Sequence, residues 1–288
     1  MADLELLIAT NGFEGSWPAI EYGTWLAGML KARVSLLGVT ERVPPAPIDD
    51  HHPLEEIFGR AVALFQEKGV SYRLEVEIGN AEEVIPRKAN ARNCIAVLGP
   101  LGRPPLRRLF LGRSIYHLME QIINPILYVP QVKLPLQKML VCMGGLGYEV
   151  TAEHLAIRLA VKSGARVTLL HVVPPVDLDY PTARTMREQW QHLLETDTPP
   201  GRALRQALEA TKQAGVHATV RLRHGHVVEE ILSEIKEGDY QLVCMGSPYS
   251  GHSLRQLYAP NVTGEVAEMA HCPVLTARYV QKEIIVED

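Results

Sequence analysis

The sequence predicts an α/β fold in which two copies of one parallel-sheet domain follow each other along the chain. Short apolar runs of strand length alternate with segments of helical periodicity over the 288 residues. The same segments then recur in the same order. "KARVSLLGVT" (31–40) returns as "GARVTLLHVV" (164–173), and "NPILYV" (124–129) returns as "CPVLTA" (272–277). Strands separated by helices imply a mostly parallel, five-stranded sheet in each copy, with helices on both faces.

In the first copy, the apolar runs predict five strands and the segments between them predict four helices. In the first helix, Tyr22, Trp25, Leu26 and Met29 recur at helical spacing, and Pro18 suits a first turn. The third helix contains Pro86, which opposes helix formation in an interior. The predicted strands are 4–10, 33–39, 70–78, 94–99 and 125–129, and the predicted helices are 17–32, 52–69, 80–91 and 114–123.

The spacing between matching segments locates an insertion and the domain boundaries. The segment "EIGNAEEVI" (77–85) returns as "RHGHVVEEI" (223–231), a wider separation than that of 31–40 from 164–173. The second copy has therefore gained residues between 173 and 223, and "DLDYPTARTMREQWQHLLETDTPP" is the expected place. The two prolines of "PQVKLPLQK" (130–138) suit a linker. We expect a first domain at 1–132, a second at 138–280 and a tail at 281–288.

Composition favours an ordinary soluble protein. A net charge of −4 gives no general affinity for nucleic acid, and no apolar window reaches the length of a membrane span. The start "MADLELLIAT" lacks the features of a signal peptide. The four cysteines form no C-x-x-C pair and lie in or beside apolar runs, which suits a reducing compartment. We expect a cytoplasmic location.

One stretch of the first copy is rich in glycine and arginine, "LGPLGRPPLRRLFLGRS" (98–114). It leaves the carboxyl end of the fourth strand, where open α/β sheets bind ligands, and it leads into a helix whose free N–H groups favour an anion. Glycines let the backbone approach a phosphate closely. The stretch is either a phosphate-binding loop or a solvated basic loop with a helix cap.

The glycine spacing resembles that of the universal stress protein family. The pattern Gly99-x2-Gly102-x9-Gly112 follows the fourth strand and is followed by "RS", a helix and "NPILYV". The second copy supplies the matching "HCPVLTA". The resemblance covers nearly the whole chain and implies two tandem Rossmann-like domains of the adenine nucleotide alpha hydrolase type.

The resemblance further implies binding of ATP or AMP in the first domain, with Mg²⁺ as a possible companion of ATP. Family members hold adenine and ribose with residues at the ends of the first and second strands, and hold phosphate with the glycine loop and the residues that follow it. Transferred residue by residue, the expected contacts are Ala9, Thr10, Asn11, Val39, Gly99, Gly102, Arg103, Gly112, Arg113 and Ser114.

The sequence departs from the family at Asn11, which stands where members usually have aspartate. Asparagine offers a neutral acceptor in place of a charged one, which weakens binding by about 1 kcal/mol. Arg113, in place of the usual small hydroxyl residue, could offset this loss at the phosphate.

The second copy has lost most of the pattern. Gly144 aligns with Asn11, and Gly246 is kept, but Pro248 and Tyr249 fall near the second glycine and Pro260 aligns with the third. Proline has no N–H to offer a phosphate. We expect no nucleotide site of the family type there.

Three functions stay open. The first is a regulatory protein that binds an adenine nucleotide. The second is a slow ATPase or nucleotidyl transferase, which the lack of any acidic residue in 98–114 disfavours. The third is an adaptor with neither site occupied.

His224 and His226, two residues apart with no third ligand at a diagnostic spacing, suit a polar turn better than a metal site. The resemblance also implies pairing of the two copies through their last strands, and a homodimer is possible.

Overall fold

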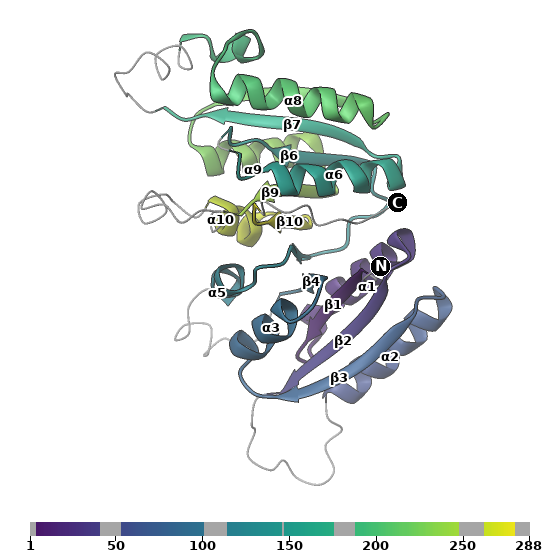
Figure 1. The fold of residues 1–288 in the computed structure, drawn as a ribbon. Coiled ribbons are helices and arrows are strands. Elements are labelled where there is room, and N and C mark those ends of the chain that lie inside the picture. Colours follow the sequence, from purple (N-terminus) through teal and green to yellow (C-terminus); the bar gives the residue numbers. More distant parts are fainter. Residues whose placement is uncertain are drawn as a thin grey trace. The chain divides into compact units, whose positions relative to one another are not determined.

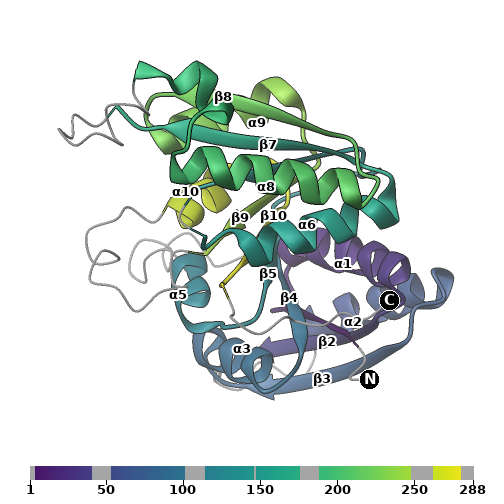
Figure 2. The same cartoon turned by 45° about the horizontal axis from the view of Figure 1, so that its top comes forward.

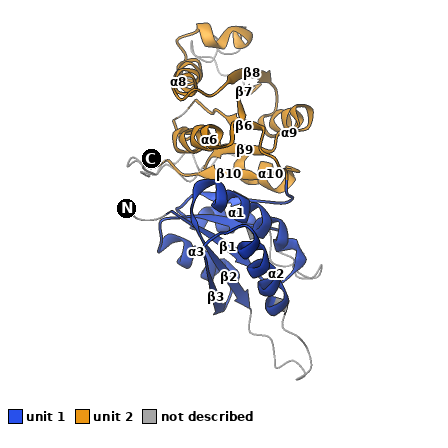
Figure 3. Ribbon diagram, turned by 90° about the vertical axis from the view of Figure 1, so that its right-hand side faces the viewer, with its two compact units in different colours: residues 1–132, 286–288 blue, residues 133–285 orange. Residues whose placement is uncertain are grey.

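A computed structural model of the chain describes residues 4–40, 53–100, 114–145, 147–175, 188–247 and 262–279 (Figure 1). The chain divides into two compact units between residues 132 and 133 (Figure 3). Each unit alternates strand and helix around its own parallel sheet, as the sequence predicts.

The first unit has the strand order β3-β2-β1-β4-β5, with every neighbouring pair parallel. Helices α1 and α2 pack together on one face of this sheet, and α3 and α5 pack together on the other. The elements are β1 (Glu5–Thr10), η1 (Glu14–Ser16), α1 (Trp17–Leu30), β2 (Arg33–Thr40), α2 (Pro53–Glu67), β3 (Tyr72–Ile78), α3 (Ala81–Asn90), β4 (Cys94–Leu98), α5 (Ser114–Gln121) and β5 (Ile126–Tyr128).

The second unit has the equivalent order β10-β9-β6-β7-β8. Helices α6 and α8 lie along one face of its sheet, and α9 and α10 lie on the other (Figures 2 and 3). The elements are β6 (Lys138–Cys142), α6 (Val150–Ser163), β7 (Arg166–Val173), η2 (Trp190–Glu195), α8 (Pro199–Gln213), β8 (Ala218–His224), α9 (Val227–Gly238), β9 (Leu242–Gly246), α10 (Val262–Met269) and β10 (Val274–Ala277).

Burial explains why these runs form strands and helices. The central strand β1 buries Leu6, Leu7 and Ile8 completely, because helices cover both faces of a parallel sheet. Helix α1 buries Tyr22 and Leu26, which share one stripe at helical spacing. The predicted α/β class and the tandem parallel sheets are confirmed.

The extra residues of the second copy lie in one connection. Strand β7 ends at Val173 and α8 begins only at Pro199, whereas their counterparts β2 and α2 end at Thr40 and begin at Pro53. The described part of the longer connection contains η2, which packs against α8 and β8. Trp190 of η2 stacks on the His224 ring of β8, with ring centroids 5.8 Å apart. The insertion therefore covers part of an edge strand.

An ion pair fastens a helix to the edge strand in each unit, and its polarity is reversed between the two. In the first unit, Lys88 of α3 lies 2.5 Å from the Glu77 carboxylate of β3. In the second unit the equivalent positions hold Glu234 of α9 and Arg223 of β8, which are 2.7 Å apart. The two copies thus keep the contact and exchange the charges.

Candidate functional site

The carboxyl ends of β1, β2 and β4 lie side by side in the first unit and form the candidate site. Thr10 is in register with Gly38 of β2, and Ala9 is in register with Leu98 of β4. Val39 directly follows Gly38, and Gly99 directly follows Leu98. Four predicted contacts, Ala9, Thr10, Val39 and Gly99, therefore come to one edge of the sheet, and Asn11 leaves it.

The turn that follows β1 is held by its own side chains. The Ser16 hydroxyl donates to the Phe13 carbonyl oxygen at 2.8 Å, which leaves the Thr10 hydroxyl to donate to Ser16 at 2.6 Å. The Gly12 N–H donates to Thr10 Oγ1 at 3.1 Å. Thr10 is only 3% exposed. Its hydroxyl proton is thus used within the turn and its side chain is buried, so its contribution to a ligand would come from the backbone.

Asn11 is half-buried and Phe13 is exposed in this turn. Asn11 Oδ1 accepts a hydrogen bond from the Phe13 N–H at 3.3 Å, an Asx turn in which Gly12 supplies the positive φ of 86°. Phe13 exposes 47% of its surface, although aromatic side chains usually bury most of theirs. No motif of the sequence singled out Phe13; its place two residues after the predicted contact Asn11 was the available signal.

Gly99 is required by the approach of β4 to the start of α1. A Cβ at this position would lie 3.0 Å from the Gly15 carbonyl oxygen and from Ser16 Cα. The first glycine of the predicted loop therefore has a packing reason independent of any phosphate. Gly102, Arg103, Gly112 and Arg113 lie outside the described residues, and Ser114 begins α5.

The corresponding edge of the second unit is closed by its own residues. Pro200 of α8 lies against the turn after β6, because a Cβ on Gly145 would be 2.7 Å from Pro200 Cα. Glu149 stands at the position of Ser16, is 3% exposed and accepts the Gly145 N–H at 2.8 Å. The space beside Gly144, the counterpart of Asn11, thus faces a buried carboxylate, whose charge opposes an anionic ligand.

A second buried carboxyl lies one turn further along α6. Glu153 is 7% exposed. Burial disfavours its charged form, and the neighbouring charge of Glu149 adds to this, so the pKa of Glu153 is raised to about 7. On β7, His171 is buried with Nδ1 2.6 Å from the Met143 carbonyl oxygen, so Nδ1 holds the proton. Burial lowers the pKa of His171, which keeps the ring neutral.

Gly246 repeats the geometry of Gly99. A Cβ on Gly246 would lie 2.7 Å from the Tyr148 carbonyl oxygen and 2.9 Å from Glu149 Cα. The second copy has therefore kept this glycine where the same backbone crossing requires it.

A sequence model of the universal stress protein family matches residues 5–130 and again residues 135–278. The chain belongs to the universal stress protein family. The double match identifies it as a tandem member, in agreement with the two sheets and with the resemblance read from the glycine spacing.

Individual relatives agree with this assignment. Universal stress protein YxiE of Bacillus subtilis (strain 168) is 27% identical over 147 residues, which is 49% of this chain and 98% of that protein. A universal stress protein from Archaeoglobus fulgidus DSM 4304 has a TM-score of 0.66 and 16% identity, with 97% of each chain covered. The functionally unknown protein PA1789 of Pseudomonas aeruginosa PAO1 has a TM-score of 0.65 and 15% identity, with 96% of this chain and 92% of that chain covered. At such identities the two structures support the universal stress protein fold alone.

The described residues contain no cluster of three or more histidine, cysteine or acidic side chains that could hold a metal ion. Among the same residues, no helix combines the length and apolar character that crossing a membrane would need.

Proposed function

We propose that this universal stress protein is a regulatory protein that binds an adenine nucleotide, ATP or AMP, in its first unit. The observation that supports this most is the meeting of Ala9, Val39 and Gly99 at one edge of the sheet, from which the chain runs through the glycine pattern into α5. The base and ribose would lie beside Asn11 and Val39. The phosphates would lie on the backbone of Gly102, Gly112 and Arg113 and at Ser114, with Arg103 neutralising charge.

The second unit would have a structural or partner-binding role. Its equivalent edge holds Pro200 against Gly145 and the buried carboxyl of Glu149. Both features oppose a bound phosphate.

Mg²⁺ would enter the first unit with ATP, through the phosphate oxygens. An alternative is an adaptor that binds no nucleotide. The neutral side chain of Asn11 and the closed edge of the second sheet favour this alternative. A slow ATPase is less favoured, since no carboxylate stands in 98–114 to hold a metal or position a nucleophile.

Replacing Gly112 by proline is expected to abolish nucleotide binding. Proline removes an N–H from the expected phosphate loop and restricts its backbone. Titration calorimetry with ATP, ADP and AMP, each with and without Mg²⁺, should show one site per chain in the natural protein and none in the variant. Gly251→Pro places the same residue in the corresponding connection of the second unit and should leave binding unchanged. Binding by Gly112→Pro as strong as that by Gly251→Pro would count against the loop of the first unit as the phosphate site. No binding to the natural protein at millimolar nucleotide would favour the adaptor.

Replacing Asn11 by aspartate is expected to strengthen nucleotide binding several-fold. The carboxylate keeps an acceptor for the Phe13 N–H and offers the ribose a charged acceptor, a gain of about 1 kcal/mol. Asn80→Asp is the matched control, because Asn80 likewise accepts a backbone N–H, that of Glu82 at 3.0 Å, but caps α3. The same titration measures both. An affinity that Asn11→Asp leaves unchanged would count against a ribose contact at this position.

A further inference from the structure

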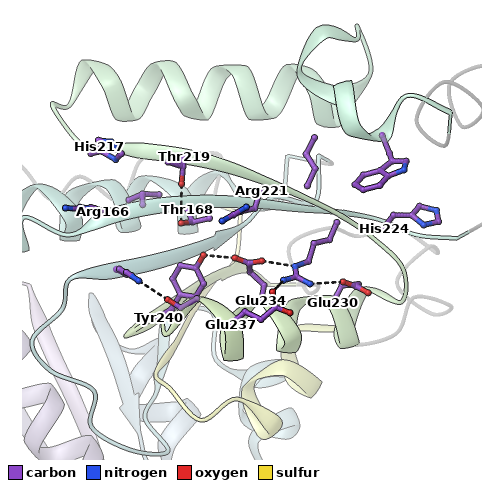
Figure 4. Close-up of a pocket in the computed structure, with 16 residues that line it drawn as sticks. Arg166, Thr168, His217, Thr219, Arg221, His224, Glu230, Glu234, Glu237 and Tyr240 are labelled. Carbon is purple, nitrogen blue, oxygen red and sulfur yellow. Dashed lines mark hydrogen bonds and ion pairs between the residues drawn. The ribbon is translucent and has the colours of Figure 1, made fainter.

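The second unit carries a polar groove of about 700 Å³ on the face of its sheet that α9 partly covers (Figure 4). Its floor is formed by β6, β7 and β8, and its wall by α9 and Tyr240. The side chains of Arg166, His217, Thr219 and Arg221 along it are exposed. The groove is distinct from the carboxyl edge of the sheet, because its most basic part lies at the amino ends of the strands.

Three basic residues form a row across neighbouring strands at this amino end. Lys138 of β6 is in register with Arg166 of β7. Val167 is in register with Ala218, which places Arg166 beside His217. Neighbouring strands are about 4.8 Å apart, so one small anion can reach side chains from more than one of them.

Hydroxyl groups stand in the next row along the same face. Thr168 and Thr219 are in register, with their hydroxyl oxygens 3.5 Å apart (Figure 4). Side chains two residues apart on a strand share a face, so these hydroxyls lie next to Arg166 and His217. The basic side chains and the hydroxyl groups together can donate several hydrogen bonds to one oxyanion.

The acidic side chains of the groove are already paired with other residues that line it. Arg223 contacts Glu234 at 2.7 Å, Glu230 at 3.2 Å and also Glu237, so one guanidinium engages all three glutamates of α9 that line the groove. Tyr240 donates to the other oxygen of Glu234 at 2.7 Å. Lys138 donates to the Gly238 carbonyl oxygen at 3.2 Å. Over the described ranges, Arg166, His217 and Arg221 have no carboxylate within ion-pair distance.

At the equivalent position of the first unit, a carboxylate of the protein itself lies among basic and hydroxyl side chains. Glu5 stands at the position of Lys138, and its carboxylate accepts hydrogen bonds from Ser35, from Arg73 at 3.1 Å and from Arg92 at 3.4 Å. Ser35 is the counterpart of Thr168. The neighbouring Glu75, which accepts from Arg92 at 2.8 Å, is the counterpart of Arg221. Two carboxylates of the first unit, Glu5 and Glu75, are thus replaced by the basic residues Lys138 and Arg221 in the second unit.

We propose that this groove binds the phosphate group of a small phosphorylated ligand, held by Lys138, Arg166 and His217 with the hydroxyls of Thr168 and Thr219. The external phosphate takes the place that the Glu5 carboxylate fills in the first unit. The site needs no part of the proposed nucleotide site, from which it differs in unit and in sheet edge.

Titration calorimetry of the full chain at constant ionic strength tests the proposal, with inorganic phosphate, glycerol 3-phosphate and glycerol as probes. Binding of both phosphates and not of glycerol is expected, and preference for the ester would identify an organic ligand over free phosphate. Arg166→Gln should weaken binding about 10-fold, as loss of a charge-assisted hydrogen bond implies. Lys138→Glu, which restores the carboxylate of the first unit, should abolish it.

Two controls decide between this site and other sources of phosphate binding. Lys212→Gln removes an exposed positive charge from α8, outside the groove, and should leave the affinity unchanged. Gly112→Pro, which alters the loop of the first unit, should also leave it unchanged. Equal weakening by Lys212→Gln and Arg166→Gln would reduce the effect to general surface charge and overturn the proposal. Loss of phosphate binding in Gly112→Pro would overturn the proposal as well. The proposal would also fail if the natural protein bound no phosphate at 10 mM, a concentration that corresponds to a binding free energy of roughly 3 kcal/mol.

Discussion

Replacing Glu153 by glutamine is expected to stabilise the protein by about 3 kcal/mol at pH 8 and to change its stability little at pH 5. The pKa of Glu153 is raised from its ordinary value of 4.5 to about 7, mainly by burial and further by the charge of Glu149. Between these two values the folded chain holds a proton that the unfolded chain has released. Stability from this group is therefore complete at low pH and is lost as the pH rises from about 4.5 to about 7.

Urea unfolding of the natural protein and of Glu153→Gln at pH 5 and pH 8 measures this effect. Glutamine keeps the shape of the protonated carboxyl and cannot ionise, so the variant should lose the part of the pH dependence that Glu153 contributes. Glu229→Gln is the control, because Glu229 occupies the first turn of α9 and is exposed. A difference between Glu153→Gln and the natural protein that is the same at both pH values would show that Glu153 titrates normally.

Replacing Gly246 by alanine is expected to destabilise the protein by about 3 kcal/mol and to lower Tm by roughly 10 °C. The new methyl group would lie 2.7 Å from the Tyr148 carbonyl oxygen, and backbone atoms cannot rotate away as a side chain can. The strand end has little freedom to retreat. The Gly246 carbonyl oxygen accepts from Thr263 at 2.9 Å, and the Ser247 N–H donates to Ala277 at 2.8 Å.

Calorimetric unfolding of two further alanine variants separates this crowding from a general effect of alanine. Gly59→Ala lies inside α2 with no atom within 4 Å of the new Cβ, and should stabilise the protein by up to about 1 kcal/mol. Gly99→Ala should cost less than Gly246→Ala, because its nearest contacts are 3.0 Å away. A neutral Gly246→Ala would mean that the second copy kept this glycine for a reason other than packing.

The periodicity of the sequence was sufficient to predict the strands, the helices and the position of the insertion. Buried strands such as β1 are continuous apolar runs, and helices such as α1 show one apolar stripe, so local pattern and burial agree. Pro86 lies inside α3, where the buried side chains of Val84 and Ile85 hold the helix against the sheet despite the missing N–H.

The closure of the second edge could not be predicted from local pattern. Glu149 and Glu153 are two acidic residues near the start of a helix, a common arrangement on solvated helices. Glu149 lies where Gly246 crosses the start of α6 and Pro200 approaches Gly145, contacts that join segments far apart in the sequence. The groove was hidden for a similar reason. Its basic character includes Lys138 and Arg221, whose charges become informative only when each residue is compared with its counterpart, Glu5 or Glu75, in the other copy.

The reversed ion pairs have a consequence for how a chain with two similar halves reaches its native state. Tandem repeats of one fold are prone to exchange elements while they fold. If α3 docked on β8, Lys88 would face Arg223, and if α9 docked on β3, Glu234 would face Glu77. Either exchange sets like charges together in a partly buried place, where repulsion is strong. The opposite polarity of the two pairs thus disfavours docking of either helix on the strand of the other copy.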